Sequence, residues 1–150
     1  MLNNRLTLNK SAFSIILLAL FVMTGCATPA NNTLSLYEAL GGQSKIEEIV
    51  DNYINEIAFD ERTYAFFKDS NMQRVKEKLS EQLCVMAKGP CTYTGDTMEQ
   101  VHSGMNITEA DFNHGVDLFI NAMDKADISH NLQNRLLKEV AKTRDQMIYR

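Results

Sequence analysis

The feature that most constrains the fold is the spacing of the apolar residues, which recur at steps of three and four from residue 35 onward. This period places them on one face of an α-helix, whereas a half-buried strand would show strict alternation. The clearest example covers residues 46–58 and carries the apolar stripe Ile46, Ile49, Val50, Tyr53, Ile54 and Ile57. No segment alternates convincingly, so the sequence predicts an all-α domain over residues 34–150.

Short motifs mark where the other helices begin and end. Ser35 to Glu38 has the S-x-x-E form of a capping box, and Thr108 to Asp111 has the related form T-x-x-D. Ser129 or Asn131 can cap the last helix, and Pro90 cannot continue a helix that starts after Asn71. Further helices are therefore predicted over 35–40, 60–68, 71–87, 97–103, 108–123 and 129–147, with a loop over 88–97.

The first 25 residues have the composition of an export signal and are excluded from the predicted fold. A positive start is followed by an apolar run from Ala12 to Met23, which has the length of a signal-peptide core. The segment 22–26, Val-Met-Thr-Gly-Cys, resembles a bacterial lipobox, which predicts cleavage before Cys26 and lipid attachment to it. Residues 26–33 then form a tether, and Ala27 favours the outer membrane, facing the periplasm. An uncleaved membrane anchor and a plain secretory signal are the alternatives.

Charge and cysteine content narrow the possible partners. Residues 1–25 hold two basic residues and no acidic one, so their removal changes the formal net charge from −4 to −6. An acidic domain of this kind argues against a nucleic-acid partner. After lipidation of Cys26, Cys84 and Cys91 remain, and an even pair in an oxidising compartment is a candidate disulfide. Two buried free thiols are the alternative.

His102 is the histidine whose surroundings best suit a ligand. It lies on a very short predicted helix between Gly95 and Gly104, with Met98 on the same face. His114 lies on an apolar-faced helix and His130 at a polar helix start, where packing and solvent exposure explain them. A haem needs one imidazole for its iron, an apolar slot and a cationic rim for its propionates. The helices at 46–58 and 71–87 can supply the slot, and Arg74 and Lys78 can supply the rim.

Several motifs occur in the order and spacing of the truncated globins of group I, and the chain resembles this family over about residues 34–148. These motifs are Leu40-Gly41-Gly42, Asp60-Glu61-Arg62, Phe66-Phe67, Asn71-Met72, Tyr93-Thr94-Gly95, Met98-Glu99-Gln100-Val101-His102 and Ile107-Thr108. The resemblance implies a two-over-two helical sandwich around haem b. The double glycine is weak evidence by itself, whereas the ordered set is specific.

The resemblance also implies roles for single residues. His102 matches the proximal ligand of the haem iron, and Phe67 matches the aromatic residue that packs on the porphyrin. Lys78 matches a position that reaches a propionate in some relatives and binds the iron in others. Other matches to pocket-lining positions are Tyr93, Met98, Val101, Ile107 and Phe112.

The ligand side of the pocket departs from the family pattern. Many relatives have a Tyr beside the bound gas, and the matching position here is Ile54. The usual Gln or Leu positions are occupied by Val75 and Leu79, which predicts an apolar wall. Tyr53 is one residue away and therefore turned by about 100° on a helix. Tyr53, Lys78 and Gln82 are the polar candidates nearby.

Two classes of function follow. The first is a haem protein that reversibly binds oxygen or nitric oxide at the membrane surface, with nitric oxide detoxification or sensing as its use. Oxidation of nitric oxide would need an electron donor, and the sequence shows no reductase site. The second is a haem-free lipoprotein that uses the same fold for interactions in the cell envelope.

Overall fold

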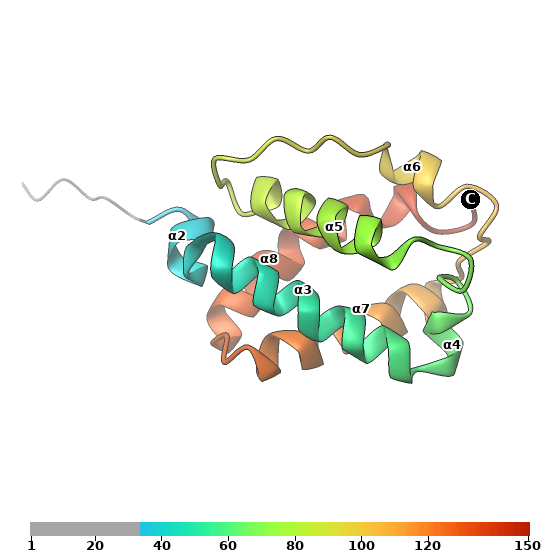
Figure 1. Cartoon of the computed structure of the whole chain (residues 1–150), viewed down its shortest axis with the longest axis horizontal. Coiled ribbons are helices and arrows are strands. Elements are labelled where there is room, and N and C mark those ends of the chain that lie inside the picture. The colour runs from blue at the N-terminus through green and yellow to red at the C-terminus, as the bar shows by residue number, and fades with distance from the viewer. Residues whose placement is uncertain (1–33) are drawn as a thin grey trace, which may run out of the picture. The chain divides into compact units, whose positions relative to one another are not determined.

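The computed structural model describes residues 34–150, which are helical and without strands over that range (Figure 1). The predicted signal over 1–25, the lipid on Cys26 and the tether over 26–33 lie outside the described residues and stay predictions. The helices are α2 (Leu36–Leu40), α3 (Gly42–Phe59), α4 (Glu61–Tyr64), α5 (Met72–Met86), α6 (Met98–Val101), α7 (Glu109–Lys125), α8 (His130–Val140) and the 3-10 helix η1 (Ala141–Gln146).

Side chains cap most of these helices at their first turn, where backbone N–H groups have no partner within the helix. Both predicted capping boxes are confirmed, at Ser35 for α2 and at Thr108 for α7, and Thr97 forms a third for α6. The side chains of Asp60 and Asn71 accept from the first turns of α4 and α5. Sequence-local polar residues therefore decide where each short segment becomes helical.

Three helices have bounds that differ from the predictions. Gly41, with φ 112°, ends α2 and also begins α3, so α3 starts at Gly42 and not near residue 46. The corner helix α4 ends at Tyr64 and not near residue 68. Helix α5 ends at Met86, as predicted to within one residue, and the chain reverses at Lys88, with φ 62°, where the Gly89 N–H donates to the Cys84 carbonyl at 2.8 Å. The last helix tightens into η1 after Val140 and ends before Met147.

The hydrophobic core forms where α3, α5, α7 and α8 meet. Helix α3 packs on both α5 and α7, and its Ile46, Ile49 and Val50 are fully buried. These residues meet the later halves of α5 and α7 and the middle of α8, through Leu83, Met123 and Leu136. The earlier halves of α5 and α7 contribute little to this cluster. Val75 and Leu79 stay half-buried there because both line a cavity, and Leu79 also packs against the core.

The segment 88–97, hereafter the strap, runs back along α5 from the end of that helix to α6 (Figure 1). A disulfide joins Cys84 of α5 to Cys91 of the strap, with their Cα atoms 6.0 Å apart. Residues 90–96 make no backbone-to-backbone hydrogen bond, so the strap depends on the disulfide and on side chains. Within residues 34–150, none of the helices is both long enough and apolar enough to cross a membrane.

Loss of the disulfide should lower the free energy of unfolding by about 2 kcal/mol, because the bond restricts the unfolded chain over a short loop. Urea unfolding of the protein with and without a thiol reductant measures the difference. The Cys84→Ala/Cys91→Ala variant should match the reduced protein and ignore the reductant. Equal unfolding midpoints for oxidised and reduced protein would contradict the prediction.

Candidate functional site

A cavity of about 470 Å³ lies between α5, the strap, α6 and α7, and its lining is mostly apolar. All residues predicted from the sequence to surround a cofactor line it, with one exception described below. They are Tyr53, Phe67, Arg74, Val75, Lys78, Leu79, Tyr93, Met98, Val101, His102, Ile107 and Phe112. Residues distant in the sequence thus meet around one space.

The exception is Ile54, for which the prediction of a place in the cavity wall is wrong. Ile54 packs against the hydrophobic core and is absent from the cavity lining, whereas Tyr53 lines it. Adjacent residues of a helix point about 100° apart, so only one of the two can face this space. The wall expected to be apolar at this point of α3 therefore carries a phenol.

His102 ends α6 and presents one ring nitrogen to the cavity. Its Nδ1 lies 2.7 Å from the Met98 carbonyl oxygen, which can only accept, so Nδ1–H is the donor. This bond assigns the proton of the neutral ring to Nδ1 and leaves the lone pair on Nε2. Burial lowers the pKa of His102, against an opposing effect of the Met98 bond. A neutral imidazole with a free nitrogen in an apolar cavity is a metal ligand by its chemistry.

The one-turn helix α6 is too short to hold this ring in place without help. The Gln82 amide of α5 donates to the Met98 sulfur at 2.8 Å, which ties the first residue of α6 across the cavity. Beyond His102, the Asn106 N–H donates to the Arg150 carbonyl and the Tyr149 N–H to the Ile107 carbonyl, both at 2.9 Å. Contacts on both sides of the ring therefore fix its position.

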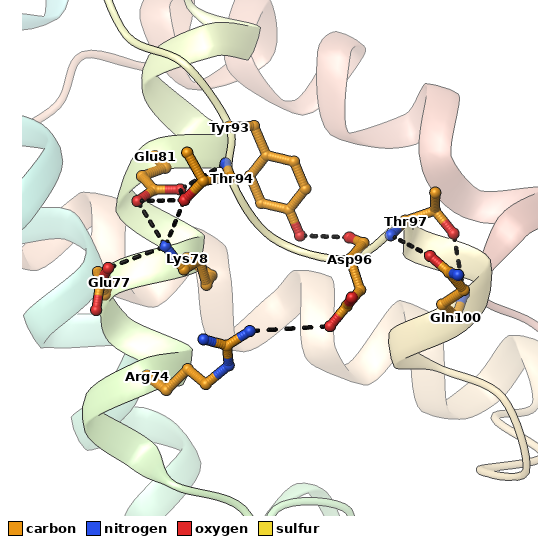
Figure 2. Close-up of polar contacts among 9 residues, drawn as sticks. All are labelled: Arg74, Glu77, Lys78, Glu81, Tyr93, Thr94, Asp96, Thr97 and Gln100. Carbon is orange, nitrogen blue, oxygen red and sulfur yellow. Dashed lines mark hydrogen bonds and ion pairs between the residues drawn. The ribbon is translucent and has the colours of Figure 1, made fainter.

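The rim carries two cations in different states (Figure 2). Arg74 is 62% exposed and lies 3.9 Å from Asp96, which is a loose pair. Lys78 is only 16% exposed and pairs with Glu81 at 2.7 Å and Glu77 at 2.9 Å. Hydrogen bonds to Glu81 and then Glu77 raise the pKa of Lys78, so the amine stays protonated. A protonated amine has no lone pair for iron, so this arrangement suits a rim cation.

The Tyr53 hydroxyl belongs to the cavity lining and has no hydrogen-bond partner within residues 34–150. Its ring meets Phe119 edge-on, with centroids 5.3 Å apart. Burial raises the pKa of Tyr53 to about 12, so the phenol keeps its proton. A side chain at Gly115 would place its Cβ 3.5 Å from this hydroxyl. This distance is an ordinary van der Waals contact, so Gly115 lies directly beside the Tyr53 hydroxyl in the cavity wall.

Sequence reasoning missed several lining residues, among them Phe66, Met86, Met105, Gly115, Val140 and Met147. Gly115 could have been noticed, because it lies three residues after Phe112 on the apolar face of its helix. Met105 and Met147 belong to irregular segments, where periodicity carries no signal.

Two side-chain pairs fasten the α4 corner to α7. His114 Nε2 lies 2.8 Å from a carboxylate oxygen of Asp60, so His114 does more than the packing predicted for it. Arg62 donates to Asp111 at 2.8 Å. The N–H of Thr63, followed by His114, lowers the pKa of Asp60 to about 2. These pairs hold the corner that carries Phe66 and Phe67 against the cavity.

Residues 34–150 contain no cluster of three His, Cys, Asp or Glu side chains that could hold a metal ion.

The residues present fit a haem. The cavity supplies apolar walls, a single imidazole with a free nitrogen, and Arg74 and Lys78 at the rim for propionates. A haem would bring the porphyrin nitrogens for its own iron, so the chain would need to supply only the His102 imidazole. A helical sandwich that directs one His into an apolar slot of this kind is the fold and site of a haem-binding globin.

Comparison with known proteins agrees with this class. The bacterial-like globin family model matches residues 35–149, and the chain belongs to that family. It is 32% identical over 107 residues to the group 1 truncated hemoglobin GlbN of Mycolicibacterium paratuberculosis, covering 71% of this chain and 79% of the relative. A second relative is the group 1 truncated hemoglobin of Tetrahymena pyriformis, 25% identical over 118 residues, or 79% of this chain and 98% of the relative.

Solved structures confirm the two-over-two sandwich predicted from the sequence. The Fe(III) form of the Tetrahymena pyriformis truncated hemoglobin superposes with a TM-score of 0.75 at 25% identity, covering 78% of this chain and all of that chain. The 2/2 hemoglobin from Synechococcus sp. PCC 7002, at 21% identity and a TM-score of 0.71, covers 77% of this chain and 98% of that one. At that identity the second comparison speaks only for the fold.

Replacing Asp60 with Asn should remove a stabilising contribution that depends on pH. The folded pKa of about 2 lies below the ordinary 3.8, so the contribution is complete above 3.8 and is lost as the pH falls toward about 2. The difference in unfolding midpoint between wild type and Asp60→Asn should therefore shrink with acidification. Asp117→Asn, at an exposed site on α7, is the control. A difference independent of pH would contradict the prediction.

Proposed function

We propose that this protein carries haem b with His102 as the proximal iron ligand and reversibly binds a diatomic gas, oxygen or nitric oxide. The observation that carries the proposal is the free Nε2 of His102 in an apolar cavity, with the Nδ1 proton held by the Met98 carbonyl. When bound, the haem supplies an iron atom with a position open to a small ligand. The chain has no C-x-x-C-H motif, which supports haem held by coordination and packing.

The choice of gas depends on what the opposite wall offers. Phe67, Val75 and Leu79 are apolar and exclude water from the cavity, and the Gln82 amide is already engaged with Met98. The Tyr53 hydroxyl lines the same cavity and donates to no group within residues 34–150. We infer that Tyr53 stabilises oxygen by a hydrogen bond, directly or through a water, whereas nitric oxide gains little from such a donor.

The proposed cellular location and the use made of gas binding are argued from the sequence. Lipid on Cys26 would hold the domain at a membrane surface, facing the periplasm of the outer membrane. Nitric oxide detoxification there would require electrons from a separate reductase, and sensing would require a downstream partner. Membership in the globin family favours the haem protein over a haem-free interaction module.

His102→Ala should abolish or shift the haem absorption band, because the iron loses its protein ligand. The protein is produced with haem available, and oxidised and reduced spectra are recorded. His130→Ala removes an exposed histidine and should leave both spectra unchanged. A folded wild type that takes up no haem would refute the proposal and leave the globin likeness as one of fold.

Tyr53→Phe should accelerate oxygen release from the haem-loaded protein by roughly tenfold, the effect of losing one hydrogen bond. Stopped-flow or flash photolysis measures the rate, with nitric oxide release as an internal comparison that should change little. Tyr64→Phe, at a partly exposed tyrosine outside the cavity lining, is the matched control. Equal oxygen release from wild type and Tyr53→Phe would exclude Tyr53 as the donor.

A further inference from the structure

The strap forms part of the cavity wall but has few attachments. Tyr93, Gly95 and Asp96 line the cavity, although residues 90–96 have no backbone-to-backbone hydrogen bond. The disulfide fixes one end of the strap at Cys91. Tyr93 donates its hydroxyl to the Asp96 carbonyl, which shapes the strap internally but does not join it to α5. Something else must hold its middle.

Glu81 supplies that attachment. Its carboxylate accepts from the Thr94 N–H at 2.8 Å and from the Thr94 hydroxyl at 2.9 Å (Figure 2). The hydrogen bond from Lys78, followed by the one from the Thr94 N–H, lowers the pKa of Glu81 to about 2. Glu81 lies one helical turn before Cys84, so the two residues fasten the strap to α5 at successive turns.

The same carboxylate determines where the Lys78 side chain ends. The Lys78 ammonium has three N–H groups and three acceptors: Glu81 and the Thr94 hydroxyl oxygen at 2.7 Å, and Glu77 at 2.9 Å. Thr94 accepts from Lys78 and donates to Glu81, so the two α5 side chains and the strap form one closed cluster (Figure 2). The ammonium has no donor left for a group inside the cavity.

We propose that Glu81 is a positioning residue of the haem site, which closes the strap over α5 through Thr94 and holds Lys78 at the rim, away from the ligand side of the iron. The proposal rests on the proposed function, because it concerns which groups reach a bound haem. It answers the question that the sequence left open for Lys78, which lines the cavity between Val75 and Leu79. Without Glu81, the flexible lysine side chain can turn toward the iron.

A comparison within the chain separates this role from an ordinary surface pair. Glu139 pairs with Lys142 at the same i,i+3 spacing, but it makes no hydrogen bond or ion pair with the strap and lies outside the cavity lining. Exposed pairs of this kind contribute little. Glu81, in contrast, also accepts from the backbone N–H of Thr94. Its removal should therefore detach the middle of the strap from α5, in addition to breaking an ion pair.

The test compares Glu81→Ala with Glu139→Ala in the full-length protein. Without haem, hydrogen exchange at the Thr94 amide should accelerate by roughly tenfold or more in Glu81→Ala, and remain unchanged in Glu139→Ala. With haem, the ferric spectrum of Glu81→Ala should shift toward a six-coordinate, low-spin form from neutral to alkaline pH. Lys78→Ala alone should leave the wild-type spectrum unchanged, and Lys78→Ala/Glu81→Ala should remove the shift.

An unchanged Thr94 exchange rate in Glu81→Ala would overturn the proposal, as would an unchanged spectrum. A shift that persists in the double variant would overturn the assignment of Lys78 as the released group. If wild-type protein takes up no haem, the proposed function fails first, and a positioning role at a haem site fails with it. The Thr94 measurement needs no haem, so it still shows whether Glu81 closes the strap.

Discussion

The burial of one face of α3 is the interaction on which the rest of the structure depends. Ile46, Ile49 and Val50 use the first half of that helix to join α5, α7 and α8 in a dry core. In the second half of the helix, Tyr53 and Ile57 line the cavity. One continuous helix therefore supplies close-packed residues to the core and lining residues to the cavity.

At the cavity end, polar contacts replace apolar packing as the means of fixing the chain. The short helices α4 and α6 begin at side-chain caps. The Arg62–Asp111 and His114–Asp60 pairs fasten the aromatic corner to α7, and Glu81 fastens the strap. Such contacts are directional, so they fix positions in a region where a large apolar group must still enter. His102 depends on this framework, because a single helical turn cannot orient its ring.

Much of this arrangement could be predicted from the sequence, and the failures have physical causes. Periodicity and capping motifs located the helices, because both are local properties. His102 could be recognised from its setting between Gly95 and Gly104. Ile54 was misplaced because a single-residue offset changes the face of a helix, and matching motifs along the chain cannot resolve that rotation. Glu81 escaped notice because its partner Thr94 lies on another segment, and an acidic residue on a helix surface has no distinguishing pattern.

The segment after His102 is paired with residues 149 and 150, far downstream in the chain. The core cluster formed by α3, α5, α7 and α8 contains none of these residues, so the histidine side of the cavity is closed by contacts that the core does not supply. A change in the last two residues would therefore act on the wall that receives the cofactor while leaving the core unaltered.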